Sequence, residues 1–527
     1  MTNREPLLKR LCVALLAIYA LWFAFNSYTR TRHFDDGDTM NFIDVARHIA
    51  SAQGVTQATL GFNQPHFNVD DPIPTPLTHQ PPLYPLMIAS VSQAGLSLTD
   101  SALLISVVSY ALALVAGYRA VLLLFGETEA LGALLLLAAY SPLRDFSDSA
   151  FSDPPGIALM LGAFWVLAHY SNRPRRRAHL ALLAGWIAAC GVATRYALAP
   201  LLAVAGLFVF VRATRRLRDS ILFMIGPGII GILLVWRNLT ILQGSVMPHF
   251  LHLHTGLVAN FFAALGTLAG DYADWGSRLV RIALLAVVIL IALWLARRRG
   301  QLAATLHGVS WKGSGSAFLV TFGLTYCVFL IVLRSHSSID PIGPRYMLPG
   351  AVTFLLLFAV FVVRATGINL GRLAGAGAVV GLGLIAYEAN ATFVTPAYSA
   401  ERRIAQSERL TWVQKNTTRD DLIIGEDSVV FPFYFDRTVA VSYSLFPSTE
   451  ILPYDKTLQL CRRFKPLYSR VLLIIPQHPT SREPGGVNWD FHLGPFIEAL
   501  NRGRTETYPA VTPLAVLADG RVFQLSC

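Results

Sequence analysis

The 527-residue chain has little charge, since Asp, Glu, Lys and Arg make up only 14% of it. Soluble domains usually carry about 25%. This shortage excludes an ordinary soluble enzyme. The chain is instead 54% apolar, with a mean hydropathy of +0.49, and its apolar residues stand in long runs. The composition indicates a polytopic membrane protein of mainly α-helical class.

Cysteine is scarce too, and its pattern indicates no metal site. The five cysteines form no Cys-x-x-Cys pair and show no spacing typical of metal ligands. Cys12, Cys190 and Cys327 fall in apolar runs, where small core residues are expected. The sequence also shows no internal repeat and no low-complexity segment.

The first apolar run, at about 11–25, lacks a small-x-small cleavage motif and is followed by Asn26-Ser27-Tyr28. We therefore expect a retained first span with the basic segment before it in the cytoplasm. Ten further spans are expected, at about 103–124, 129–142, 154–171, 178–194, 196–211, 219–238, 279–296, 315–333, 346–363 and 373–392.

Arginine clusters orient this bundle. The run 85–98 is too short to span and is expected to be an interfacial or re-entrant helix. Counting it as a span would put nearly all of the Arg clusters outside, against the positive-inside bias. The 11-span arrangement keeps the clusters inside. It places on the outer side the segments 26–102, 143–153, 239–278 and 334–345, and the tail from about 393.

The net charge of +11 belongs to the membrane part. Residues 1–400 carry 28 Lys and Arg against 18 Asp and Glu, whereas residues 401–527 carry 15 against 14. The basic residues stand mostly as short Arg clusters between apolar runs, which is how topology is fixed in a bilayer. Nucleic acid is therefore not expected as a partner, and the lipid bilayer is.

From about residue 393 the sequence has the charge density of a soluble domain, so a domain boundary is expected between 392 and 393. Residues 1–392, with the first outer loop 26–102, form the transmembrane domain, and 393–527 form a small extracytoplasmic α/β domain. Strand-like runs stand at 421–425, 438–441 and 471–475, with helical stretches at about 405–415 and 494–501. On an oxidising side of the membrane, Cys461 and Cys527 either form a disulfide or remain one buried and one terminal thiol.

The first outer loop is unusually acidic. Asp35, Asp36 and Asp38 stand together, and from Asp38 on the spacing predicts an amphipathic helix along the membrane interface, with Phe42 on its apolar face and Asp44, Arg47 and His48 on the other. Asp38 alone would be read as a helix N-cap. Three acids in four residues exceed what a cap requires, and close carboxylates raise one another's pKa, which suits a general base.

Other outer segments bring further polar groups, each with a simpler structural interpretation. The two prolines of His79-Gln-Pro-Pro-Leu-Tyr-Pro85 would form a backbone corner, and Asp153 could cap the span that follows it. Single arginines at an outer membrane edge could reach lipid headgroups. Aspartates and arginines gathered on one side are, together, what a transferase with a lipid phosphate donor needs. The arginines are Arg195, Arg237 and Arg345.

The order of these motifs resembles the GT-C membrane glycosyltransferases, over roughly residues 10–390. Within them it is most similar to the branch of protein O-mannosyltransferases and lipid A aminoarabinose transferase. The motifs that carry the resemblance are Asp38, Phe42, Ala46 and Arg47, then His79-Gln-Pro-Pro-Leu-Tyr-Pro85, Ser152-Asp-Pro-Pro155, Gly191-Val-Ala-Thr-Arg195 and Pro344-Arg-Tyr-Met-Leu-Pro349.

The resemblance implies an inverting transfer of a sugar from a polyprenyl-phosphate carrier to an extracytoplasmic lipid, glycan or protein, in a bacterial inner membrane. It implies that a first-loop aspartate acts on the acceptor, which maps to Asp38 with Asp36 as rival, and that Asp153 is the second acidic position. It assigns donor binding to Arg47, His79, Arg195, Arg237, Arg345 and Tyr346. The transfer step itself needs no redox cofactor, because polyprenyl phosphate is already a tolerable leaving group once its charge is neutralised. A divalent cation could help at the acidic cluster, but none is predicted because the most similar branch generally uses none.

A transporter or flippase for a lipid-linked or anionic substrate is the alternative. Transport sites usually lie at mid-membrane, on broken spans arranged as repeats. Here the polar candidates crowd the outer edge, so a glycosyltransferase is the favoured interpretation.

Overall fold

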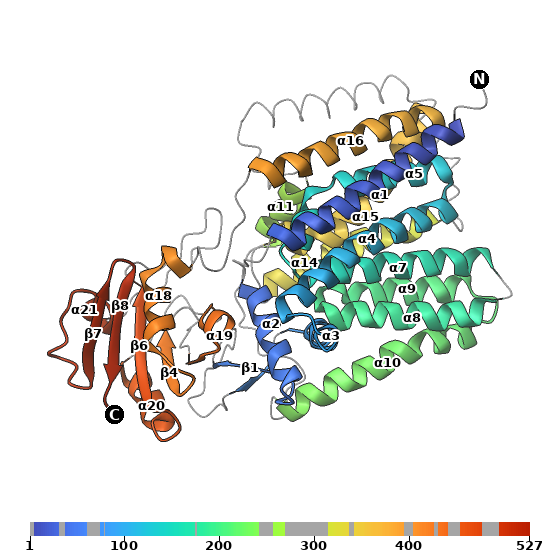
Figure 1. Ribbon diagram of the computed structural model, residues 1–527. Helices are drawn as coiled ribbons and strands as arrows, with labels where there is room; N and C mark the ends of the chain where they lie inside the picture. Colours follow the sequence, from blue (N-terminus) through green and yellow to red (C-terminus); the bar gives the residue numbers. More distant parts are fainter. Residues whose placement is uncertain are drawn as a thin grey trace. The chain divides into compact units, whose positions relative to one another are not determined.

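The computed structural model describes residues 5–30, 37–60, 74–77, 80–173, 176–241, 257–268, 315–336, 342–394, 404–425, 430–440, 454–476 and 495–527. The chain divides into two compact units, and Figure 1 shows their elements. Unit 1 contains Met1–Ser27, Ser106–Leu234 and His252–Thr395, and unit 2 contains Tyr28–Ile105, Val235–Leu251 and Pro396–Cys527.

Unit 1 is a helical bundle (Figure 1). Three of its helices, α1, α4 and α10, have residues in both units. The helices are α1 (Glu5–Arg30), α4 (Leu98–Leu124), α5 (Glu127–Ala139), α6 (Ser141–Asp148), α7 (Asp153–Asn172), α8 (Arg177–Thr194), the 3-10 turn η2 (Tyr196–Leu198), α9 (Ala199–Arg212), α10 (Arg216–Ile241), α11 (Leu257–Leu268), α14 (Gly315–His336), α15 (Pro344–Thr366) and α16 (Leu370–Val394).

The mainly helical fold is confirmed, and ten of the eleven predicted spans coincide with helices. The remaining predicted span, 279–296, lies outside the described residues. Seven helices in the described part of the chain are long and apolar enough to cross a membrane. A helix rises about 1.5 Å per residue, so α5, with 13 residues, falls short of a hydrocarbon core of about 30 Å. The count of eleven therefore stays a prediction.

Aromatic packing ties α7 to α14 in the core of unit 1. Phe164 makes edge contacts with Phe318, at 5.0 Å between ring centroids, and with Phe322, at 5.3 Å. Tyr326 follows Phe322 one turn later, at 5.8 Å. All four rings are buried. The stack leads along α14 to the polar cluster at the beginning of α7.

Unit 2 is built around a six-stranded mixed sheet in the order β2-β5-β4-β6-β8-β7. The pairs from β2 to β6 are parallel, and β6–β8 and β8–β7 are antiparallel. The strands of this sheet are β2 (Thr59–Leu60), β4 (Asp421–Gly425), β5 (Thr438–Ala440), β6 (Arg470–Pro476), β7 (Val511–Leu517) and β8 (Gly520–Leu525). A separate antiparallel pair is formed by β1 (Thr56–Gln57) and β3 (Thr75–Pro76). The helices are α2 (Gly37–Ala50), α3 (Leu83–Ser92), α18 (Glu408–Asn416), α19 (Val430–Phe435), α20 (Tyr454–Phe464) and α21 (Pro495–Asn501).

The tail elements match the sequence pattern. The three predicted strands coincide with β4, β5 and β6, and the two predicted helical stretches with α18 and α21. β4 is buried at every position. Leu422, Val471 and Leu473 from β4 and β6 pack in a core with Phe496 of α21. A central strand covered by helices needs this continuous apolar run.

Part of the segment 26–102, which the sequence pattern assigned to the transmembrane domain as its first outer loop, joins this sheet. Thr59 and Leu60 of β2 pair with Val439 and Ala440 of β5. A two-residue strand between turns carries no periodic signal, so the pattern could not reveal it. The run 85–98 contains a separate short helix, α3, and α4 begins at Leu98.

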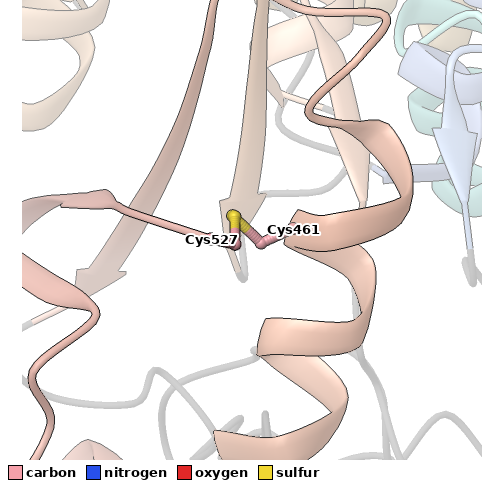
Figure 2. The surroundings of a disulfide bond; sticks show 2 residues. All are labelled: Cys461 and Cys527. Atoms are coloured by element: carbon pink, nitrogen blue, oxygen red, sulfur yellow. A yellow bond between two sulfur atoms is a disulfide. The ribbon is translucent and has the colours of Figure 1, made fainter.

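A disulfide closes the tail. Figure 2 shows Cys461 of α20 bonded to Cys527, with 6.0 Å between their Cα atoms. Of the two readings that the sequence left open, the structure has the paired one. The bond fastens α20 to the residue that ends the chain after β8.

Candidate active site

Asp153 is the first residue of α7 and binds two arginines, Arg195 after the end of α8 and Arg345 of α15. Its Oδ2 accepts hydrogen bonds from Arg195 Nη1 at 2.6 Å and from Arg345 Nε at 3.1 Å. The N-cap of α7 is Ser152, and the Asp153 side chain is 1% exposed. The capping interpretation is therefore wrong for Asp153. Its carboxylate binds guanidinium groups, and the positive end of the α7 dipole favours the anion there.

Arg195 lies at the break between α8 and η2. Its backbone is extended, with φ −153° and ψ 112°, and its N–H donates to Gly191 at 2.9 Å. Gly156 of α7 faces this break. A Cβ on Gly156 would lie 3.2 Å from Leu198 and 3.7 Å from the Cβ of Arg195. The missing side chain lets α7 approach closely enough for Asp153 to reach Arg195.

Aromatic rings fix both guanidinium groups. Arg345 Cζ lies 4.3 Å from the ring centroid of Phe151, and Arg195 Cζ lies 5.4 Å from that of Tyr346. The Tyr326 hydroxyl donates to the Tyr346 carbonyl at 2.7 Å, which holds the beginning of α15 against α14. Such cation–π contacts orient a guanidinium while leaving its edge available for hydrogen bonds.

This cluster has unused hydrogen-bonding capacity. Among the described residues, Asp153 Oδ1 and Arg195 Nε are buried without a hydrogen-bond partner. One carboxylate stands against two guanidinium groups, so the cluster carries a net positive charge. Arginine donors around a buried, net positive position are suited to a phosphate group.

Asp38 lies in the first turn of α2 and contacts the His-Gln-Pro-Pro motif. Gln80 Nε2 donates to Asp38 Oδ1 at 2.7 Å, and Asn41 Nδ2 donates to Gln80 Oε1 at 3.2 Å. Asn41 is fully buried, and Gln80 is nearly so. The two amides orient the Asp38 carboxylate. The structure thereby brings together two motifs that the sequence suggested separately.

The polar face predicted for α2 is buried, and that part of the prediction is wrong. Asp44 is 2% exposed and His48 is 7% exposed. His48 Nδ1 lies 2.9 Å from Thr56 Oγ1, and Asp44 Oδ2 accepts a hydrogen bond from the backbone N–H of Ala58 at 2.7 Å. The strand segment after α2 and helix α19 cover this face, which the local pattern could not foresee.

Arg47 is bound by the tail. Its Nη1 donates to the Pro432 carbonyl at 2.8 Å and its Nη2 to the Phe433 carbonyl at 3.1 Å, both in α19. These contacts account for the guanidinium without a phosphate. Donor binding by Arg47 stays a prediction.

Three other predicted site residues have no described contact with Asp38 or with the Asp153 cluster. Asp36 and His79 lie outside the described residues. Arg237 lies near the end of α10 and donates to Asn238 Oδ1 at 3.3 Å. Their roles stay predictions.

Sequence reasoning missed three contributors. Gln80 stood in a motif that was read as a backbone corner, and Phe151 and Tyr326 gave no signal beyond apolar or span composition. The sequence holds one hint for Gln80. It stands directly before the two prolines, and a polar side chain beside such a rigid corner is held in place.

Comparison with known proteins identifies the architecture. Residues 79–239, which include Asp153 and Arg195, match the family described as dolichyl-phosphate-mannose-protein mannosyltransferase. ArnT from Cupriavidus metallidurans in the apo state superposes with a TM-score of 0.59 at 13% identity, covering 97% of each chain. Its structure bound to undecaprenyl phosphate gives 0.57, with the same identity and coverage. No curated protein sequence matches the chain significantly.

The chain has the GT-C glycosyltransferase fold. An oligosaccharyltransferase from Archaeoglobus fulgidus, solved with zinc and sulfate, superposes with a TM-score of 0.51 at 13% identity, over 88% of this chain and 68% of that one. The predicted resemblance to the GT-C branch of mannosyltransferases and ArnT is confirmed. The seven long apolar helices and this fold make the chain a multi-pass membrane protein.

Proposed function

We propose that the chain transfers a sugar from a polyprenyl-phosphate-linked donor to an acceptor outside the cytoplasm, with inversion at the anomeric carbon. The observation that carries the proposal is the Asp153–Arg195–Arg345 cluster at the ends of three helices. It is net positive, and its Asp153 and Arg195 side chains are buried. The GT-C fold supports the reaction class.

The leaving group of this reaction is a lipid phosphate. Departure of the sugar leaves negative charge on the phosphate oxygens, and preorganised guanidinium groups stabilise that charge as it develops. Arg195 and Arg345 would bind the phosphate, and Asp153 keeps both in position. The likeness to an ArnT structure with undecaprenyl phosphate supports a donor of this kind.

Asp38 is the proposed base. The acceptor oxygen or nitrogen attacks the anomeric carbon, and the bond from that carbon to the phosphate oxygen breaks with its electron pair. Asp38 takes the acceptor proton. A single displacement inverts the anomeric configuration. The Asn41–Gln80 pair supports this role, because it orients the Asp38 carboxylate.

The reaction needs no redox cofactor, and we propose none. Among the described residues, no three His, Cys, Asp or Glu side chains gather where a metal ion could bind. The protein is proposed to lie in a bacterial inner membrane, with a cytoplasmic N-terminus and an extracytoplasmic tail. The acceptor is a lipid, a glycan or a protein.

A transporter would place its charged groups in the middle of the spans. Here Asp153 begins α7, Arg345 is the second residue of α15, and Arg195 follows the last residue of α8. Charges at helix ends fit a reaction at the membrane edge better than a path through it.

The decisive experiment supplies purified protein in detergent with synthetic polyprenyl-phosphate sugars and a cell-envelope extract as acceptor source. Transfer of label from donor to acceptor, with inverted configuration, is expected. No transfer from any polyprenyl-linked sugar, together with movement of the intact donor across proteoliposomes, would establish the transporter instead.

A further inference from the structure

Helix α2 is held at its far end by the C-terminal part of the chain. Two nitrogens of the Arg47 guanidinium donate to two successive carbonyls of α19, at 2.8 Å and 3.1 Å. The Pro432 carbonyl also accepts the backbone N–H of Asp436 at 3.0 Å. The negative end of the helix dipole favours a cation beside both carbonyls. Arg47 therefore binds α19 at two points with a fixed geometry.

The same end of α2 is fastened a second time through the sheet. Asp44 Oδ2 accepts from the N–H of Ala58 at 2.7 Å, and Asp44 Oδ1 accepts from Arg47 at 3.2 Å. The Ala58 carbonyl in turn accepts from the N–H of Val439 in β5 at 3.2 Å. Asp44 thus links the guanidinium to the strand that joins the tail.

Asp436, the first residue after α19, also contacts Arg47. Asp436 has a φ of 53°, which a non-glycine residue rarely adopts. Its carboxylate lies 3.5 Å from Arg47 Nη1 and also pairs with Arg419, whose side chain is 77% exposed. A strained backbone that presents a carboxylate to Arg47 indicates that the contact is specific.

Asp38 stands on the same helix as Arg47. A helix moves as a rigid rod over so short a distance, so whatever fixes Arg47 also fixes the direction of the turn that carries Asp38. Gln80 holds that first turn, and α19 with β5 holds the last one.

We infer that the C-terminal α/β part positions the proposed base Asp38 through Arg47 and Asp44, and that Arg47 is a positioning residue. The inference rests on the proposed function for its catalytic consequence only. It gives the tail a role in the reaction without contact between the tail and the sugar.

The test compares Arg47→Ala, Arg47→Lys and the control Arg419→Ala in the full chain. With Arg47→Ala, kcat for transfer should fall about tenfold, because two charge-assisted hydrogen bonds are lost, while the donor KM stays within about twofold. Amide hydrogen exchange in residues 38–50 should become about tenfold faster. Arg47→Lys keeps one donor and should lie in between. Arg419→Ala removes a cation beside Asp436 without touching α2 and should match wild type.

Two results would overturn the inference. A higher donor KM in Arg47→Ala with unchanged exchange in α2 would make Arg47 a donor ligand, and unchanged kcat and exchange would mean that the tail does not position the helix. If wild type transfers no sugar, the proposed function fails by itself. Amide hydrogen exchange in residues 38–50 then still tests whether the tail holds α2. Exchange in Arg47→Ala that is as slow as in wild type refutes the inference. If Arg47→Ala does not fold, Arg47→Lys supplies both measurements.

Discussion

Gln80 donates a hydrogen bond from its side-chain amide to Asp38 at 2.7 Å, across 42 residues of sequence. A carboxylate beside an amide is oriented without being neutralised, so it remains able to accept a proton. Asn41 fixes the direction of the Gln80 amide, because it donates to the Gln80 oxygen and thereby turns the NH2 group toward Asp38. The three side chains form an ordered polar cluster at the first turn of α2, where we propose the base.

Asp38→Asn should leave the protein folded in detergent and reduce sugar transfer by at least about 100-fold, since the acceptor proton loses its base. Asp36→Asn is the matched comparison, because Asp36 is the rival for the same role. Transfer of label from a synthetic polyprenyl-phosphate donor measures both variants. Full activity of Asp38→Asn with loss in Asp36→Asn would exchange the two assignments.

Gln80→Ala should lower kcat severalfold and leave the donor KM nearly unchanged, because the base loses its orientation and the phosphate site is untouched. Gln93→Ala, an exposed change at the end of α3, serves as control. Steady-state kinetics at varied donor concentration separate the two constants. A rise in KM alone would place Gln80 on the donor.

Arg195→Ala and Arg345→Ala should each raise the donor KM or Kd by about tenfold or more, because each removes a cation from the phosphate position. Arg215→Ala changes the charge equally at an exposed residue before α10 and should bind the donor as wild type does. Binding of polyprenyl phosphate measured by calorimetry checks this directly. Equal affinity in all variants would remove the phosphate from this cluster.

His48 gives unit 2 a pH dependence. Burial lowers the pKa of His48, and the nearby Asp44 carboxylate opposes that shift. The unfolded chain therefore binds a proton more readily than the folded one below about pH 6.5, so stability should fall as pH falls through that range. His48→Gln should flatten this part of the curve in thermal unfolding between pH 7.5 and about 5. An unchanged slope would refute the assignment to His48.

Loss of the Cys461–Cys527 bond should destabilise the tail. The bond joins residues 66 apart, and closing a loop of that size is worth about 4 kcal/mol in the chain-entropy estimate. Cys527→Ser should therefore lower the unfolding temperature, whereas Cys190→Ser, in a helix of unit 1, should not reproduce the effect. Thiol labelling under denaturing conditions checks the pairing. Two labelled tail thiols in wild type would exclude it.

The helices were predictable because their apolar runs are long, and the tail strands because a buried central strand must be apolar throughout. Strand β2 could not be predicted, because a strand of two residues between turns leaves no periodic pattern. In the site, Asp153, Arg195, Arg345 and Tyr346 were predicted from residue type and motif order, and the structure brings them together. Arg47 was predicted as a donor ligand. It donates instead to two backbone carbonyls 385 and 386 residues later, which no local pattern encodes.

The contact between Arg47 and Pro432 also sets an order of events during biosynthesis. α2 and β2 leave the ribosome early, and β5, β4 and β6 exist only after nearly the whole chain has been made. Until then Arg47 has no carbonyls to bind, and β2 has no neighbour in its sheet. A chain released before β5 would already carry the described helices α1 to α16 and still lack the partners of Arg47 and β2. The fastening of α2 by the tail therefore has to wait until α19 and β5 have been synthesised.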